Sequence, residues 1–128
     1  MDQAITTVLR PVSVGVIALV RDALARSDDL RRAPWRGKEN PYAGHCYVAS
    51  EVLYVLLGGK EAGWTPQSLR HEGATHWWLR HADGRVVDAT ADQFGSDVPY
   101  SNGRGRGFLT EQPSKRAKIL LERMMCGT

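Results

Sequence analysis

Three side chains, those of Cys46, His76 and Asp88, carry groups that together could form a nucleophilic catalytic site. A cysteine attacks a carbonyl carbon efficiently only as a thiolate, so it needs a base within reach. That base in turn needs a carboxylate or an amide that orients it. These residue types therefore predict acyl transfer by a cysteine nucleophile, provided that the fold brings the three side chains together.

The sequence around Cys46 predicts that its sulfur lies at the start of a helix. Apolar residues recur at helical spacing over residues 45–57, and Gly58 and Gly59 then end the pattern. Unpaired N–H groups and the helix dipole stabilise negative charge at such a start. Gly44 would let a substrate approach the backbone closely. A cysteine on an apolar helix is also a common packing residue, so this segment alone does not decide its role.

A β-hairpin is expected to bring the histidine and the aspartate together. Residues 75–79 and 86–90 flank the turn residues 82–84. A two-residue turn would point Asp88 to the opposite face of the sheet from His76. A three-residue loop, with Gly84 in the left-handed conformation that such loops favour, would set His76 opposite Thr90 and Asp88 diagonal to His76 on the same face. We predict the second register, in which the carboxylate can reach the imidazole.

The other periodic segments predict an α+β domain. Pro11 can open a helix that ends near Arg26, residues 64–72 can hold a short strand, and Pro113 precedes an amphipathic last helix. The antiparallel sheet is expected to pack on the Cys46 helix. We expect a single domain over residues 1–128. Its parts are an N-terminal helical segment (1–38), the Cys46 helix with the hairpin (39–95), and a Gly/Arg loop with the C-terminal helix (96–128).

Composition limits the class of protein. The 128 residues are 42% apolar and 24% charged, with a net charge of +3, as in ordinary globular proteins. Two cysteines form neither a disulfide framework nor a four-cysteine zinc site, so a reduced, cytoplasmic location is expected. The apolar run over residues 12–20 is too short to span a bilayer, which takes roughly 20 residues. We therefore expect no membrane role.

Aromatic and basic residues leave a nucleic-acid-binding alternative open. Tryptophans could stack on bases while basic side chains contact phosphates. Arg104 and Arg106, separated by glycines, could instead form a basic lid over an acidic or phosphorylated substrate, or an ordinary surface loop. Trp77 and Trp78 must point to opposite faces of their strand, one into the core and the other toward a cleft. The residues of the nucleic-acid alternative are Trp35, Trp64, Trp77, Trp78, Arg104, Arg106, Lys115 and Arg116.

The sequence leaves two further alternatives, a metal site and a partner-binding protein without catalysis, such as an inhibitor. The metal site has weak support, because the candidate ligands do not have a recognised zinc-binding spacing and two of them, His76 and His81, would face opposite sides of one strand. No metal and no organic cofactor is expected. The candidate metal ligands are His45, Cys46, His71, His76 and His81.

Short motifs in the middle of the chain resemble the YunG-like family of small bacterial proteins. That family has a Gly-Gln-Cys helix start, a histidine on a strand, and an Asp-Leu-Thr followed by Gln-Phe. More distantly, the order Cys, His, Asp is similar to the transglutaminase-like and arylamine acetyltransferase branch of the papain-like cysteine enzymes. The resemblance spans residues 42–94, and its motifs here are Gly44, His45 and Cys46, then residues 75–78, then residues 87–94.

The resemblance implies a small papain-like fold with Cys46 as nucleophile, His76 as base and Asp88 as its orienting group. Where papain-like enzymes often use a glutamine to bind the oxyanion, this chain has His45, so the Cys46 N–H with His45 or Asn40 would serve. The expected function is a cysteine hydrolase or acyltransferase that acts on an amide, isopeptide or thioester bond of a substrate that could be anionic. The expected substrate-binding residues are Asn40, Gly44, His45, Trp77, Trp78, Arg104 and Arg106.

Overall fold

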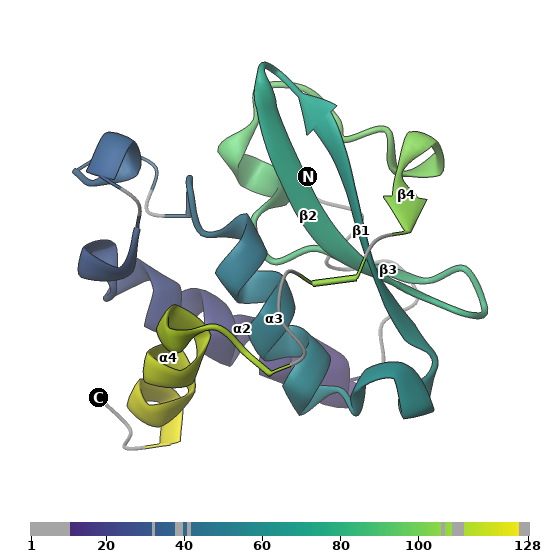
Figure 1. Ribbon diagram of the computed structural model, residues 1–128, viewed down its shortest axis with the longest axis horizontal. Helices are drawn as coiled ribbons and strands as arrows, with labels where there is room; N and C mark the ends of the chain where they lie inside the picture. The colour runs from purple at the N-terminus through teal and green to yellow at the C-terminus, as the bar shows by residue number, and fades with distance from the viewer. Residues whose placement is uncertain are drawn as a thin grey trace.

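The computed structural model has an α+β fold, as predicted, in which helices lie against an antiparallel sheet (Figure 1). The structure describes residues 11–31, 33–37, 40, 42–105, 107–108 and 112–125. Within these ranges there are three α-helices and four strands, and the strand order in the sheet is β3-β2-β1-β4.

The helices are α2 (Pro11–Ala25), α3 (Cys46–Leu56) and α4 (Lys115–Met125), close to the predicted bounds. The start of α3 at Cys46 agrees with the prediction for the nucleophile. Helix α4 begins two residues after Pro113, because Ser114 caps it: the Ser114 Oγ accepts a hydrogen bond from the Ala117 N–H at 3.2 Å.

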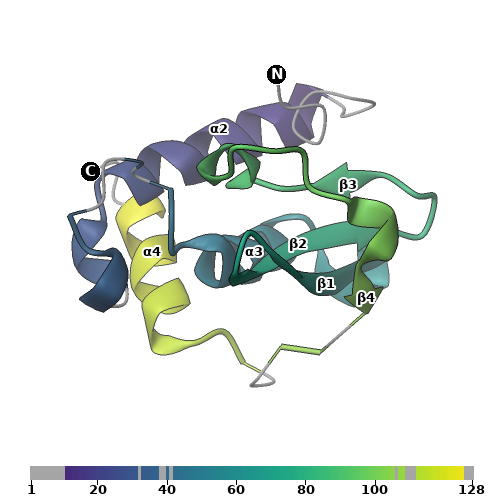
Figure 2. The ribbon, with the colours of Figure 1, turned by 90° about the horizontal axis from the view of Figure 1, so that it is seen from above.

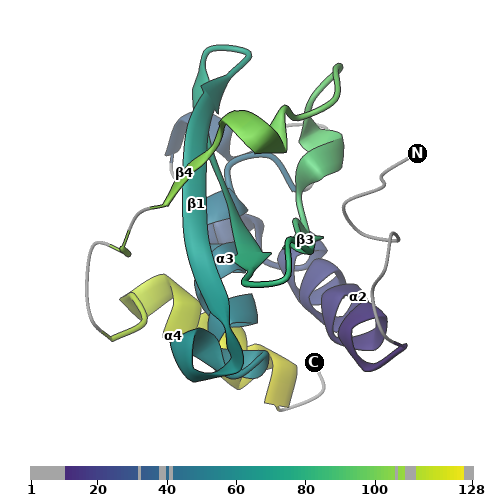
Figure 3. The same ribbon diagram turned by 90° about the vertical axis from the view of Figure 1, so that its right-hand side faces the viewer.

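Helix α3 is the central element of the fold. It contacts β2 on one side and both α2 and α4 on the other, and Figures 2 and 3 show it between the sheet and these two helices. Its buried face packs on apolar side chains from each neighbour, so the sheet and the helices share one core. Buried members of that core include Ile17, Leu24, Val52, Leu53, Leu79 and Leu120.

The register of the second hairpin confirms the prediction. Strand β2 (Ala74–His81) pairs with β3 (Val86–Val87) so that Leu79 lies opposite Val87. The loop holds three residues, and Gly84 has a φ of 96°. Strand β3 is shorter than predicted because Asp88 begins a turn, in which its Oδ1 accepts the Thr90 N–H at 3.1 Å.

The predicted strand over residues 64–72 is present, and the sheet has two further features that were not expected. Strand β1 (Trp64–His71) forms a first hairpin with β2 around Glu72 and Gly73, both of which have positive φ angles. The expected Gly/Arg loop contains a short strand, β4 (Arg104–Gly105), which pairs with the outer edge of β1. Gly103 permits this approach, since a Cβ there would lie 2.2 Å from the Trp78 ring. Arg106 lies outside the described residues.

Candidate active site

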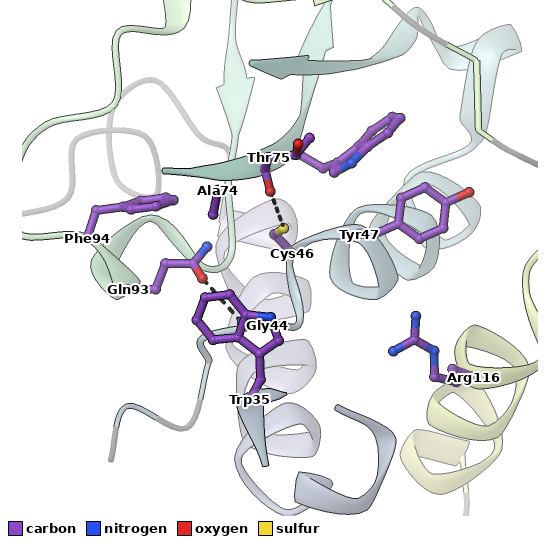
Figure 4. Close-up of a pocket in the computed structure, with 10 residues that line it drawn as sticks. Trp35, Gly44, Cys46, Tyr47, Ala74, Thr75, Gln93, Phe94 and Arg116 are labelled. Carbon is purple, nitrogen blue, oxygen red and sulfur yellow. Dashed lines mark hydrogen bonds between the residues drawn. The ribbon is translucent and has the colours of Figure 1, made fainter. Parts of the chain in front are cut away.

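Cys46 is the first residue of α3, and a tight turn sets its position. Gly44 has a left-handed φ of 84°, and a Cβ at Gly44 would lie only 2.5 Å from Cγ of Trp35. The buried Arg31 side chain donates hydrogen bonds to the Ala43 and Asn40 carbonyls and so stabilises the turn before Cys46. The Cys46 thiol is partly exposed, and it donates a hydrogen bond to the Thr75 carbonyl oxygen at 3.6 Å (Figure 4).

His76 and Asp88 form a buried pair next to the thiol. Their side chains are 0% and 1% exposed, and His76 Nε2 donates to Asp88 Oδ2 at 2.6 Å. The carboxylate also accepts the Tyr100 hydroxyl at 2.8 Å and the Thr90 N–H at 3.1 Å. With three donors around it, this carboxylate is fixed in position and in turn fixes the imidazole ring.

Electrostatics favour the charged form of His76. Burial by itself lowers the pKa of the ring, but the hydrogen bond to Asp88 and the neighbouring Cys46 side chain outweigh it and raise the pKa to about 9. Because Nε2 is bonded to Asp88, any proton exchange between the ring and the thiol would have to use Nδ1.

Gln93 is a site residue that sequence reasoning did not single out. It ends the short 3₁₀ helix η4 (Ala91–Gln93), and its Nε2 donates to Nδ1 of His76 at 3.0 Å. Its Oε1 accepts the Gly44 N–H at 3.3 Å. One amide thus connects the imidazole with the turn before Cys46. The signal that could have found it was the Gln-Phe motif in the resemblance.

Helix α2 holds the Gln93 segment in place. Arg21 forms two hydrogen bonds with the Asp92 carboxylate, at 2.8 and 3.0 Å, and donates to the Ala89 carbonyl at 2.8 Å. The guanidinium carbon also lies 3.9 Å from the centre of the Tyr42 ring. Arg21 therefore ties the segment that carries Asp88 and Gln93 to the loop that precedes Cys46.

A cavity of about 170 Å³ opens at the sulfur of Cys46 (Figure 4). Aromatic rings from several elements form much of its wall, and the Gln93 amide borders it. The aromatic lining residues are Trp35, Tyr47, Trp77 and Phe94, and Arg116 contributes a cation. The pocket thus combines aromatic and polar lining groups, a combination by which ligand sites hold and orient a small group.

Two of the expected substrate-binding residues, Gly44 and Trp77, line this cavity. Trp78 points to the opposite face of β2, where it is fully buried against Tyr100, so the alternation of the two tryptophans is as predicted but Trp78 is not at the cavity. Arg104 is exposed on β4 and does not line the cavity either.

The two side chains expected to bind an oxyanion have other positions. The Asn40 side chain donates to the Asp92 carbonyl and accepts the Tyr42 N–H, so it shapes the loop. The His45 side chain is fully buried beneath the helix start, and neither ring nitrogen makes a hydrogen bond of ordinary geometry, although the Leu24 carbonyl lies nearby. Burial, and then the charges of Arg31 and Arg116, lower its pKa to about 4.

The structure also bears on the alternatives. Among the described residues, no three His, Cys, Asp or Glu side chains gather closely enough to hold a metal ion. Trp64 is buried like Trp78, so neither ring is available to stack on a base. Nowhere in the described ranges is a helix both long enough and apolar enough to cross a membrane.

Comparison with known proteins identifies the family. A family model described as YunG protein matches residues 19–124 of the chain. The chain belongs to the YunG family. The match covers most of the chain and includes every residue of the site built above, from Arg21 to Arg116. Neither the curated proteins nor the solved structures include a match to this YunG chain.

Proposed function

We propose that this chain is a papain-like cysteine hydrolase or acyltransferase that cleaves an amide, isopeptide or thioester bond through Cys46, His76 and Asp88. The main support is the buried 2.6 Å hydrogen bond between His76 Nε2 and Asp88 Oδ2, which makes Nδ1, now bonded to the Gln93 amide, the nitrogen that would exchange a proton with the thiol. A carboxylate that orients an imidazole beside a cysteine at a helix start is the arrangement that nucleophilic catalysis requires.

In the proposed reaction, His76 Nδ1 takes the thiol proton and the Cys46 sulfur attacks the carbonyl carbon. A C–S bond forms while the carbonyl π electrons move to the oxygen. When this tetrahedral intermediate collapses, the bond to the leaving group breaks and His76 protonates the leaving group. The resulting thioester is then attacked by water, which gives hydrolysis, or by another nucleophile, which gives acyl transfer.

Gln93 takes over the role that the resemblance gave to His45 or Asn40. Once Nδ1 carries a proton, it no longer accepts the Gln93 N–H, so that N–H becomes available to an oxyanion in the cavity. The Cys46 N–H supplies a second donor, because the first N–H groups of a helix lack intrahelical partners. The Cys46 N–H is available throughout, whereas the Gln93 N–H would be released only by proton transfer to Nδ1, when negative charge develops on the substrate oxygen.

Alkylation with iodoacetamide tests the proposal. Cys46 is expected to react at least about ten times faster than Cys126 near neutral pH, because Cys46 has a base and a helix start beside it. Peptide mass spectrometry over a time course measures both rates in one sample. His76→Ala should slow the labelling of Cys46. The matched control is His81→Ala, at the far end of the same strand, where the ring bonds to the Ala62 carbonyl.

Equal reactivity of the two thiols would contradict the catalytic proposal. The alternative, a nucleic-acid-binding protein without catalysis, makes a different prediction. Its affinity for nucleic acid would fall steeply with salt concentration and would be insensitive to Cys46→Ala. Nucleic-acid binding by the unchanged chain and by Cys46→Ala, measured over a series of salt concentrations, therefore distinguishes the two functions.

A further inference from the structure

Glu72, at the tip of the first hairpin, has a backbone conformation that its residue type disfavours. Its φ is 50°, and Gly73 follows with a φ of 82°, so both positions of this two-residue turn are left-handed. Such turns favour Asn-Gly or Gly-Gly, because a Cβ crowds the backbone in the left-handed region. Among the described residues, Glu72 is the one non-glycine residue with a positive φ. Residues held in this way by their surroundings cluster at functional sites.

The Glu72 side chain binds the segment that follows Gln93. Its carboxylate accepts hydrogen bonds from the Ser96 N–H at 2.9 Å, from the Gly95 N–H at 3.3 Å and from the Ser96 hydroxyl. The bonds from the Ser96 hydroxyl and then from the Gly95 N–H hold the pKa of Glu72 below its usual value, so the carboxylate is charged at neutral pH. The tip of the hairpin is therefore tied to residues 95–96.

Phe94, the residue after Gln93, connects this contact with the active site. The Phe94 ring packs edge-on against the His71 ring on the hairpin and against the His76 ring, each with its centroid 4.7 Å away. The His71 ring also forms a hydrogen bond with the Ser96 hydroxyl at 3.1 Å. The hairpin tip thus contacts three consecutive residues, directly after the one whose amide bonds to Nδ1 of His76.

Gln93, at the wall of the cavity (Figure 4), is therefore held from both sides. On the side that precedes it, Asp92 forms an ion pair with Arg21 of α2. On the side that follows it, Ser96 is bonded to Glu72. A side-chain amide makes a good hydrogen bond only within narrow limits of distance and angle, so the backbone that carries it has to be fixed.

We infer that Glu72 is a positioning residue, which holds Gln93 in contact with Nδ1 of His76 and thereby sets the pH at which Cys46 becomes reactive. This inference rests on the proposed function and goes beyond it by naming a residue that acts on the base from outside the described cavity wall. An asparagine or a glycine would suit the turn better, but neither could place a carboxylate at Ser96.

Two effects of losing the carboxylate have opposite signs. If Gln93 is released, the neutral ring of His76 loses a hydrogen bond, so the pKa of His76 rises and the pH midpoint for alkylation of Cys46 falls. If Glu72 acts only through its charge, its removal destabilises the imidazolium, so the pKa of His76 falls and the midpoint rises. Asp88, which also faces the ring, is unchanged in both cases.

Alkylation by iodoacetamide across a pH series tests the inference. Glu72→Asn suits the turn and removes the carboxylate, and we expect it to lower the Cys46 midpoint by about 0.3–0.7 pH unit, up to the effect of one neutral hydrogen bond. Glu72→Gln keeps an oxygen that can accept the Ser96 N–H, so its shift should be smaller. Asp97→Asn is the matched control, since it removes a negative charge from the exposed residue next to Ser96. It should raise the midpoint by at most about 0.2 pH unit, because solvent and salt screen that charge.

A double variant identifies the route of the effect. Glu72→Asn combined with Gln93→Ala should have the same midpoint as Gln93→Ala alone, because Glu72 acts through that amide. A thermal melt of each variant checks the fold, and Glu72→Gln provides the same test if Glu72→Asn is unstable. The inference is overturned by a midpoint that stays constant or rises in these Glu72 variants, or by shifts that simply add in the double variant.

An NMR titration of the His76 ring separates the inference from the proposed function. The ring signal is identified by its loss in His76→Gln, and its pKa is expected to be higher in Glu72→Asn than in the unchanged chain. If that shift occurs but Cys46 reacts no faster than Cys126, the proposed function fails and the positioning role stands. If Cys46 is the faster thiol but the His76 titration does not change, the inference alone fails.

Discussion

The amide of Gln93 and the carboxylate of Asp88 act on His76 in opposite directions. Asp88 bonds to Nε2 and helps to raise the pKa of the ring to about 9, which favours the imidazolium. Gln93 donates to Nδ1, and such a bond exists only while Nδ1 lacks a proton. The two bonds therefore favour opposite protonation states of the ring, and the raised pKa means that the charged state prevails below about pH 9.

Replacement of Gln93 tests this balance. Gln93→Ala removes a hydrogen bond, worth about 1 kcal/mol, that stabilises only the neutral ring. The pH midpoint for iodoacetamide alkylation of Cys46 should therefore move to lower pH, as measured by rates across a pH series. A midpoint that moves to higher pH, with a slower rate throughout, would mean that Gln93 serves only to hold the ring in place.

At the residue scale, sequence reasoning succeeded where spacing determines geometry. The loop length between β2 and β3 determines the face on which Asp88 lies, so the contact with His76 could be predicted from the hairpin alone. Gln93 and Arg116 could not be placed in this way. They reach the cavity through tertiary contacts, such as that of Arg21 with Asp92, which no local pattern encodes.

At the scale of elements, the turn before α3 has a strict steric requirement. Gly44→Ala would force a side chain into the left-handed region and within 2.5 Å of Trp35. We expect a loss of at least about 1–3 kcal/mol in the free energy of unfolding, measured by urea denaturation. Gly15→Ala is the matched control, because Gly15 lies inside α2 with no atom near its Cβ position, and the change should stabilise by about 0.5–1 kcal/mol. Equal effects of the two substitutions would contradict this account.

The elements themselves differ in how well the sequence predicts them. Helix α3 has a broad apolar stripe and a double glycine after it, so its bounds could be predicted to within a residue. Strand β4 could not, because a segment of alternating glycines and arginines has no strand pattern. Its pairing with β1 depends on Gly103 lying against the Trp78 ring, a contact between distant parts of the chain.

At the scale of the whole molecule, two buried histidines predict how stability depends on pH. Folding lowers the pKa of His45 from 6.5 to about 4, so the unfolded chain binds more protons in that range, and stability should fall as the pH drops from about 6.5 toward 4. Folding raises the pKa of His76 to about 9. The contribution of His76 to the stability of the folded state is therefore complete below pH 6.5 and is lost as the pH rises through 9.

A plot of the free energy of unfolding against pH is therefore expected to have its maximum near pH 6.5. On either side, that free energy should fall by an amount on the order of 1–3 kcal/mol. Urea denaturation at a series of pH values measures it. His45→Leu should flatten the acid side, since it removes the group that must gain a proton in the interior. His76→Gln should flatten the alkaline side. If the free energy of unfolding of His45→Leu still falls as steeply at acid pH, groups other than His45 cause that fall.

Arg21 makes α2 part of the site's support, although none of the cavity-lining residues that the structure describes comes from that helix. Truncation from the amino end is therefore expected to disturb the site once it removes Arg21, well before it reaches the proposed catalytic residues. A library of variants confined to the cavity walls would overlook it for the same reason.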